Sequence, residues 1–600
     1  MTSRIGLFAV TAAGRRAASE LADQLGPDAV LVDGPIQPAL RRMWPELDAA
    51  VFFLATGATV RLIAPLLADK HTDPGVVCVD EARRFAVALA GGHGGGANAL
   101  AERVAAALGS VPVVTTASDA TGNTPLDELV DLLDATVDGD LASCGVAVLD
   151  GSPVRLLNPL RFPLPALPST VGERIENPLW TILVDDRAPD ADQLRGAGRV
   201  LRLIPRTLVV GLGSARGVPA EAVTRTLAEL TASHRLDPRA IRAFASIDLK
   251  ADEQGLLDAI TAGLGADGWR LDQPELRCYP ADSLSIVEVP NPSEVVRAEV
   301  GTPSVAEAAA LRAAGELADG APVELVAPKI KGANVTVAAA RIRPRGRLAV
   351  VGLGPGAADL RSPRAEAELR RASVVVGLDS YVDQVRHLLR PGTDIRESGL
   401  GAEEARAREA VELAGSGRAV ALIGSGDAGV YAMASPALEQ CGARGGSAIE
   451  VVGVPGITAA LAAAALLGAP LGHDHAMISL SDLHTPWPAI ERRIRAAAEG
   501  DFVVCFYNPR SRERDWQLDA ALRLLREHRP AGTPVGAVRQ ASRPGQRVWI
   551  EPIGDFDTAA VDMFTTVIVG SSQSRIVDNR MITPRGYQWM PEPVDARDEG

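Results

Sequence analysis

Short runs of apolar residues recur along the whole chain and alternate with longer stretches of helical periodicity. Such runs occupy Ile5–Val10, Ala50–Leu54, Val76–Val79, Leu208–Val210, Leu348–Val351, Val374–Val376, Val420–Ile423 and Phe502–Phe506. They are rich in Val and Ile and mostly lack apolar–polar alternation, which is typical of strands buried on both faces of a parallel sheet. Helical patterns lie between them at Ala97–Leu108, Ala220–Ala232 and Ser304–Leu317. The sequence therefore predicts an α/β fold that is repeated several times.

The chain is too long for one hydrophobic core, because its 600 residues exceed the usual size of a single domain. Changes in composition mark the boundaries that we expect. The expected parts are an N-terminal α/β domain (1–139), an irregular Pro- and Arg-rich middle region (140–205), a second α/β domain (206–343), a C-terminal module (344–588) and a disordered tail (589–600). The middle region is either a small domain or a long connection, and the basic segment Arg341–Arg347 is a linker.

Composition and charge disfavour several classes of protein. The formal net charge of -14 argues against general nucleic-acid binding, although it is compatible with a local basic pocket. The 5 cysteines form no C-x-x-C pair, which disfavours a disulfide framework or a zinc site and fits a reducing compartment. The N-terminal apolar run predicts a strand rather than a secretory signal, and no apolar run reaches the roughly 20 residues of a membrane span. We expect a soluble cytoplasmic protein that binds neither nucleic acid nor a membrane.

A glycine-rich loop follows the strand predicted at Leu348–Val351. Gly352, Gly354 and Gly356 allow tight turns and a close approach of the backbone to a ligand. A dinucleotide site normally continues with G-x-x-G spacing, an immediate helix and an acidic residue about 20 positions later. Pro355 departs from that pattern. Taken alone, the loop is compatible with a structural turn or a ligand site, and a nicotinamide ligand is disfavoured.

Four further motifs accompany this loop. They are GSGDAGVYAMA from Gly424, HDHAMISLSDLHTPW from His473, YNPRSRER from Tyr507 and TPRGY from Thr583. With these motifs, the sequence from Arg347 to Tyr587 resembles the class III tetrapyrrole methyltransferase family, and within it the precorrin-3B C(17)-methyltransferase branch. The resemblance implies two α/β subdomains with S-adenosylmethionine bound in the cleft between them, and a homodimer formed through this module.

The resemblance also implies which residues bind the cofactor. By position they are Gly354, Pro355, Gly356, Gly426, Asp427, Val430, Tyr431, Thr458, Ala459, Ser481, Tyr507 and Asn508. The sulfonium donor carries an activated methyl group, and the acceptor is an electron-rich ring carbon. Catalysis then consists mainly of positioning and exclusion of water, which suits glycines, small residues and backbone donors.

The implied substrate is a precorrin or cobalt-precorrin, a ring that bears many carboxylates, for which arginines are natural partners. The candidates are Arg361, Arg364, Arg492, Arg493, Arg510, Arg512 and Arg514, each of which is alternatively a solvated surface charge. His473 and His475 flank Asp474. This segment is either a hydrogen-bonded loop or a site of substrate contact and proton transfer, with Asp474 as a candidate catalytic residue. Any cobalt would arrive inside the ring, since the sequence shows no dedicated metal cluster.

The N-terminal half contains a second set of motifs. They lie at Phe53–Glu81, Ala88–Val104, Pro112–Gly122, Val209–Val223, Ala245–Leu257 and Val326–Ile342. They resemble the two domains of the cobalt-precorrin-5A hydrolase family, which opens a δ-lactone on the ring and releases a two-carbon aldehyde. That reaction needs an activated water and a stabilised oxyanion.

His93 is the first candidate base of this half, and Lys70 and Asp248 are further catalytic candidates. Other candidates are Asp73, Asp80, Glu81, Lys250, Asp252, Glu253 and Lys329. The glycine-flanked loop around His93 is compatible with a structural turn, with anion binding at the start of the following helix, or with catalysis.

The leading hypothesis is a bifunctional enzyme of cobalamin biosynthesis. It would methylate precorrin-3B at carbon 17 with ring contraction, using S-adenosylmethionine, and its fused hydrolase-like half would open a lactone. Tethering two activities that handle related intermediates raises their effective concentration. The alternatives are a class III methyltransferase for another acceptor with a corrinoid-binding, non-catalytic N-terminal half, and a nicotinamide oxidoreductase.

Overall fold

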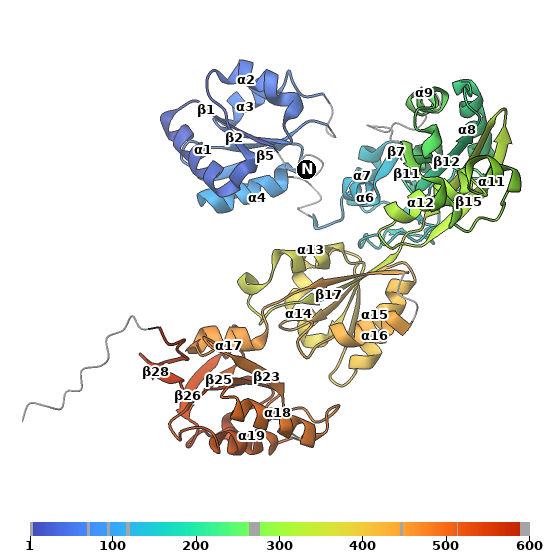
Figure 1. The fold of residues 1–600 in the computed structure, drawn as a ribbon. Helices are drawn as coiled ribbons and strands as arrows, with labels where there is room; N and C mark the ends of the chain where they lie inside the picture. The colour runs from blue at the N-terminus through green and yellow to red at the C-terminus, as the bar shows by residue number, and fades with distance from the viewer. Residues whose placement is uncertain are drawn as a thin grey trace, which may run out of the picture. The chain divides into compact units, whose positions relative to one another are not determined.

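The computed structural model describes residues 4–68, 72–92, 96–115, 121–262, 276–443, 448–512 and 514–587 (Figure 1). The predicted tail at 589–600 lies outside these residues. The chain forms two compact units, the first of Met1–Arg345 with Arg390–Gly392 and the second of Gly346–Leu389 with Thr393–Gly600. Both are built from several α/β sheets, as the sequence predicts. Among the described residues, the helices are too short or too polar to cross a bilayer.

The first sheet of the first unit has the strand order β2-β1-β3-β4-β5-β6. Its strands are β1 (Ile5–Ala9), β2 (Ala29–Leu31), β3 (Ala49–Phe53), β4 (Gly75–Val79), β5 (Phe85–Ala90) and β6 (Val111–Val113), and its helices are α1 (Ala12–Leu25), α2 (Ile36–Met43), α3 (Thr56–Ile63) and α4 (Ala97–Leu108). Helices α1 and α4 pack on one face, and α2 and α3 on the other (Figure 1). This layered arrangement explains why the strands are apolar along their whole length.

The second sheet, of order β7-β11-β10-β8-β9, occupies the segment predicted to be irregular. Its strands are β7 (Ala135–Asp138), β8 (Val154–Leu157), β9 (Val171–Gly172), β10 (Trp180–Val184) and β11 (Arg199–Pro205), and its helices are α6 (Leu126–Leu133) and α7 (Leu141–Leu149). The segment contains more regular secondary structure than the sequence predicts. Its strands are short and lie between Pro- and Gly-rich connections, so each has too few residues to show a hydrophobic period. Strand β10 is nevertheless buried throughout.

The third sheet has the order β14-β13-β12-β16-β15. Its strands are β12 (Leu208–Ser214), β13 (Ile241–Ile247), β14 (Leu276–Tyr279), β15 (Val323–Gly332) and β16 (Val335–Ile342), and its helices are α8 (Ala220–Ser233), α9 (Gln254–Ala262), α10 (Ala281–Ser285), α11 (Glu294–Val300) and α12 (Ala306–Leu317). The apolar run predicted at Leu208–Val210 is part of β12, which pairs in parallel with β13 on one side and antiparallel with β16 on the other. Strand β14 continues the parallel part, and β15 and β16 form an antiparallel hairpin. A strand covered on both faces is apolar in either direction, so composition alone does not reveal its orientation.

The second unit begins with a fully parallel sheet of order β19-β18-β20-β17-β21. Its strands are β17 (Gly346–Gly352), β18 (Val374–Leu378), β19 (Asp394–Ser398), β20 (Ala419–Gly424) and β21 (Ile449–Val454), and its helices are α13 (Pro363–Arg371), α14 (Asp379–Val385), α15 (Glu403–Gly415) and α16 (Ala434–Ala443). Helices α15 and α16 cover one face and α13 and α14 the other.

A second sheet, of order β23-β24-β27-β25-β26, completes this unit together with a small sheet of order β22-β29-β28. The elements are α17 (Ala459–Leu467), β22 (Gly468–Ala469), β23 (His475–Ser479), α18 (Trp487–Glu499), β24 (Val503–Tyr507), α19 (Gln517–Arg526), β25 (Pro534–Arg539), β26 (Arg547–Pro552), β27 (Thr565–Val569), β28 (Arg575–Val577) and β29 (Arg580–Ile582). Helices α18 and α19 cover one face and α17 the other. Only the β23–β24 pair is parallel among the described pairings of the larger sheet.

Small residues let the helices lie close against these sheets. Close packing of this kind is expected where few aromatic side chains are present to fill the core. The clearest case is Gly211 of β12, where a Cβ atom would lie 1.8 Å from the carbonyl oxygen of Ala306 in α12. The helix backbone therefore touches the strand, and the packing there tolerates no side chain.

We expect Gly211→Ala to lower the free energy of unfolding of this domain by about 2–3 kcal/mol, because the added methyl group forces α12 away from the sheet. Gly315→Ala in the same helix is the matched control. Its added methyl group would meet no atom within 4 Å, so it should stabilise the domain slightly through helix propensity. Calorimetry of the full chain measures both shifts, and equal transition temperatures for the two variants would contradict this account.

Candidate active site

Three loops meet at the carboxyl ends of the parallel strands β17, β20 and β21. The loops after β17 and β20 are joined by reciprocal hydrogen bonds: the Gly354 N–H donates to the Gly426 carbonyl at 3.0 Å, and the Gly426 N–H donates to the Gly354 carbonyl at 2.8 Å. A Cβ atom on Gly456, in the loop after β21, would lie 2.1 Å from the Gly426 oxygen. Glycine is therefore required where the loops touch. Loops at this edge of an open α/β sheet commonly bind ligands.

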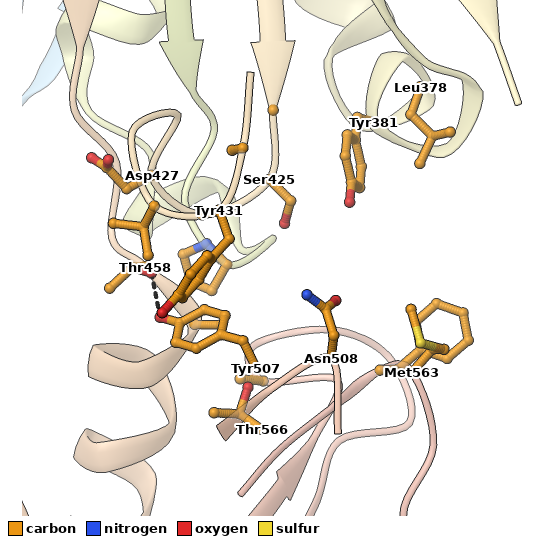
Figure 2. Close-up of a pocket in the computed structure, with 18 of the residues that line it drawn as sticks. Leu378, Tyr381, Ser425, Asp427, Tyr431, Thr458, Tyr507, Asn508, Met563 and Thr566 are labelled. Atoms are coloured by element: carbon orange, nitrogen blue, oxygen red, sulfur yellow. Dashed lines mark hydrogen bonds between the residues drawn. The ribbon is translucent and has the colours of Figure 1, made fainter. Parts of the chain in front are cut away.

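Asp427 fastens two of these loops to each other. One carboxylate oxygen accepts the Gly429 N–H at 2.8 Å, and the other accepts the Gly456 N–H at 3.0 Å. In Figure 2 the Asp427 carboxylate points away from the centre of the pocket, which agrees with these bonds. The side chain thus shapes the loops through backbone donors within its own subdomain.

A pocket of about 290 Å³ opens beside the loops, between the parallel sheet and the sheet that contains β24. The parallel-sheet side contributes Pro355, Leu378, Tyr381, Leu400, Glu403, Arg406, Ile423–Asp427 and Val430–Met433. The other side contributes Thr458 and Ala459 at the start of α17, and Tyr507, Asn508, Val538, Gln540, Ala541, Arg543 and Met563–Thr566. Figure 2 shows the polar ends of Tyr381, Ser425 and Asn508 directed into this space. The pocket therefore offers both apolar walls and a few convergent polar groups, as ligand sites usually do.

Two tyrosines connect the sides of the pocket. The Tyr507 hydroxyl lies 2.6 Å from the Thr458 hydroxyl and accepts the Ala460 N–H at 3.0 Å, so it caps the start of α17 (Figure 2). The Tyr431 hydroxyl donates to the Met477 carbonyl at 2.7 Å, and the two tyrosine rings lie 5.1 Å apart. Burial raises the pKa of both phenols. Both hydroxyls therefore remain protonated at neutral pH and keep these hydrogen bonds.

Left-handed backbone occurs at several residues of the pocket lining. Tyr431, Asn508 and Gln540 all line it, and their φ angles are 51°, 49° and 49°. Left-handed conformations are uncommon for residues other than glycine and tend to occur where function requires a particular backbone path. This strain supports a ligand-binding role for the pocket.

Comparison with known proteins identifies the family to which the second unit belongs. Residues 347–557 match the family model for tetrapyrrole (corrin/porphyrin) methylases. A probable cobalt-factor III C(17)-methyltransferase from Salmonella typhimurium is 47% identical over 243 residues, which are 40% of this chain and 99% of that protein. The chain belongs to the tetrapyrrole methylase family. A precorrin-3B C(17)-methyltransferase from Sinorhizobium sp is 43% identical over 250 residues, covering 40% of this chain and 97% of that protein.

Further matches concern the solved structures and the N-terminal half. The crystal structure of the methyltransferase CobJ is 41% identical, with a TM-score of 0.38, and the match covers 40% of this chain and 100% of that chain. Residues 38–119 match the family model for the cobalamin synthesis G N-terminal region, and residues 208–340 match that for its C-terminus. The resemblances stated from the sequence for both halves are thereby confirmed. The chain thus combines a methylase module with two segments that match the cobalamin synthesis G models.

The structure brings most of the predicted cofactor residues to the pocket of the methylase module. Pro355, Gly426, Asp427, Val430, Tyr431, Thr458, Ala459, Tyr507 and Asn508 line it. Gly354 and Gly356 lie in the adjoining loop, and the Ser481 hydroxyl accepts a hydrogen bond from Arg514 at 3.2 Å. Asp474 is exposed and does not line the pocket; its carbonyl accepts the Val503 N–H.

Two predicted catalytic residues of the N-terminal half, His93 and Lys70, lie outside the described residues. Asp248 lies at the end of β13, where its exposed carboxylate accepts the Leu249 N–H at 2.7 Å. Near it, the buried Lys250 faces Glu253 at 3.8 Å.

Among the candidate arginines, Arg514 lies beside the pocket. Its guanidinium donates to the Asn508 carbonyl at 3.1 Å and to the Met563 sulfur at 3.4 Å, and both of these residues line the pocket. Arg361 is 8% exposed and pairs with Glu366 at 3.4 Å, so its charge already has a local partner.

Sequence reasoning missed several lining residues. They are Leu378, Tyr381, Leu400, Glu403, Arg406, Ser425, Met433, Val538, Gln540, Ala541, Arg543 and Met563–Thr566. Most follow the ends of strands far apart in the chain, and no short motif links them. Ser425 and Met433 are exceptions, since both lie inside the GSGDAGVYAMA motif.

We expect Tyr507→Phe to destabilise the methylase module by about 1–3 kcal/mol, because the Thr458 hydroxyl and the Ala460 N–H both lose their partner. Tyr381→Phe is the control, since its hydroxyl forms no hydrogen bond within the described part of the chain. Urea unfolding followed by fluorescence compares the two. The capping role is wrong if both variants unfold at the same urea concentration.

Proposed function

We propose that the methylase module transfers a methyl group from S-adenosylmethionine to carbon 17 of a precorrin ring during cobalamin biosynthesis, with ring contraction. The observation that carries this proposal is the hydrogen-bonded pair of glycine loops, which closes one side of a pocket lined mostly by the family-matched residues 347–557. The names of the relatives from Salmonella and Sinorhizobium supply the position of methylation.

The residues of the pocket fit this donor. The glycine loops present backbone close to the ligand space, and a side chain on Gly352 or Gly456 would collide with the neighbouring loop. Tyr431 and Leu378 provide apolar surface, and Ser425 and Asn508 provide polar groups directed into the pocket. S-adenosylmethionine supplies an already activated methyl group. The chain then has to orient donor and acceptor and to exclude water, tasks that this lining performs without a nucleophile.

Arg514 is the arginine that we propose for a carboxylate of the ring. Its position beside Asn508 and Met563 places a cation at the margin of the donor pocket. A planar guanidinium suits a carboxylate. We further propose that the protein is cytoplasmic and that the module forms a homodimer, as the family resemblance implies.

Gly456→Ala should lower the affinity for S-adenosylhomocysteine by about tenfold or more, because the new methyl group separates the loops that form the pocket. Gly453→Ala is the control, since its methyl group would meet nothing within 4 Å. Calorimetric titration of the full-length chain measures both affinities. Methyl transfer is then followed with labelled S-adenosylmethionine and precorrin-3B or cobalt-factor III, and failure of both rings to gain the label would refute the proposed activity.

For the N-terminal half we propose lactone opening on a cobalt-precorrin. The support is the pair of family matches at residues 38–119 and 208–340. Asp248 is the described candidate base, because its carboxylate is exposed at the carboxyl end of β13, beside the buried cation of Lys250. Binding of the lactone without turnover is the second candidate for this half, and His93 and Lys70 remain proposed catalytic residues.

We expect Asp248→Asn to slow release of the two-carbon aldehyde by about a hundredfold, because an amide cannot accept the proton of the attacking water. Methyl transfer by the same variant should stay unchanged. Asp282→Asn, which alters another exposed carboxylate of this domain, is the control. Mass spectrometry of the ring and of the trapped aldehyde gives both rates. Aldehyde release at the unmodified rate would remove Asp248 from the reaction, and no release by the unmodified chain would favour binding alone.

A further inference from the structure

Arg543 lies between the two sides of the methylase pocket. It belongs to the turn that joins β25 and β26, yet its Nε donates to the Pro355 carbonyl at 2.6 Å and its Nη2 donates to the Ser425 hydroxyl at 2.7 Å. These two acceptors lie in the loops after β17 and β20, the loops that hydrogen-bond to each other. One side chain from the far subdomain therefore holds both glycine loops.

The glycine loop is shaped to admit this side chain. A Cβ atom on Gly356 would lie 2.6 Å from both Cγ and Nε of Arg543, and Gly356 has a φ of 141°. Glycine is therefore favoured at position 356 for two reasons. The turn has a positive φ there, and the Arg543 side chain passes where a Cβ atom would lie.

Arg543 differs from the other contacts that join the two sides. Tyr507 lies in β24, and the Tyr431 hydroxyl donates to the Met477 carbonyl of β23 while its ring packs against the Tyr507 ring. Arg543 is carried by a turn in which residues 540–543 are half-buried and residues 544–546 are exposed, with φ angles of 49° at Gln540 and 60° at Ser542. Arg543 can leave its two acceptors through movement of its own side chain and turn, without unpacking a strand or helix.

We propose that Arg543 is a positioning residue that latches the pocket over the bound methyl donor and sets how long donor and demethylated product stay bound. This inference rests on the proposed use of S-adenosylmethionine. In the latched arrangement the guanidinium holds Pro355 and Ser425, both of which line the pocket, against the turn that also contributes Gln540 and Ala541. Product release requires the turn to withdraw Arg543 from its two acceptors.

The test measures binding and dissociation of S-adenosylhomocysteine by stopped-flow on the full-length chain. Arg543→Ala should raise the dissociation rate by about tenfold or more and leave the association rate within about threefold, because two charge-assisted hydrogen bonds are lost only after closure. Arg543→Lys, which can keep one bond, should give an intermediate rate. Arg547→Ala is the matched control, since Arg547 stacks on Trp549 at 4.8 Å and does not line the pocket.

A double-variant comparison separates a latch from general loosening of the pocket. Ser425→Ala should raise the dissociation rate less than Arg543→Ala does, and the two changes together should raise it by less than the product of their separate factors, because the two side chains share one contact. The latch would be overturned if Arg543→Ala left the dissociation rate unchanged, or if it raised the association and dissociation rates equally. The proposed function would still stand. Failure of the unmodified chain to bind S-adenosylhomocysteine would instead overturn the proposed function and the latch with it.

Discussion

The methylase site depends on two reciprocal backbone hydrogen bonds, between Gly354 and Gly426. They join the loops of neighbouring parallel strands, β17 and β20, at the edge where the sheet opens. Because the loops touch through backbone atoms, the space beside them stays free for a ligand. Asp427 adds a second connection by accepting N–H groups from its own loop and from Gly456. Main-chain contacts therefore shape one side of the pocket, and side chains such as Tyr381, Tyr507 and Asn508 line the rest.

The second subdomain completes the pocket through a few side chains of different character. Tyr431 connects the two sides, because its hydroxyl donates to the Met477 carbonyl of β23 and its ring packs against the Tyr507 ring. Tyr507 caps α17 within the second subdomain. Arg543 reaches the glycine loops from the partly exposed turn between β25 and β26. Such a division between permanent and releasable contacts is what a site needs when it must enclose a donor and release a product in every cycle.

The N-terminal unit matches both family models of cobalamin synthesis G. Its sheets contain both parallel and antiparallel strand pairs. The described catalytic candidate Asp248 again lies at the carboxyl end of a parallel strand. Both halves thus place their candidate residues where open α/β sheets offer loops to a ligand. Fusion of the two families in one chain fits successive handling of related, unstable rings, since tethering raises the local concentration of each partner.

The sequence by itself determined the repeated α/β class, the two families and the glycine loops, because long apolar runs and clustered motifs are local properties. It also identified Tyr431, Tyr507 and Asn508 as site residues, although it did not reveal their left-handed backbone or their hydrogen bonds. Only the tertiary structure decided that Asp427 fastens loops, that β15 and β16 run antiparallel, and that Arg543 touches Pro355 and Ser425. Those features arise from contacts between residues far apart in the chain, and neither periodicity nor motif spacing records such contacts.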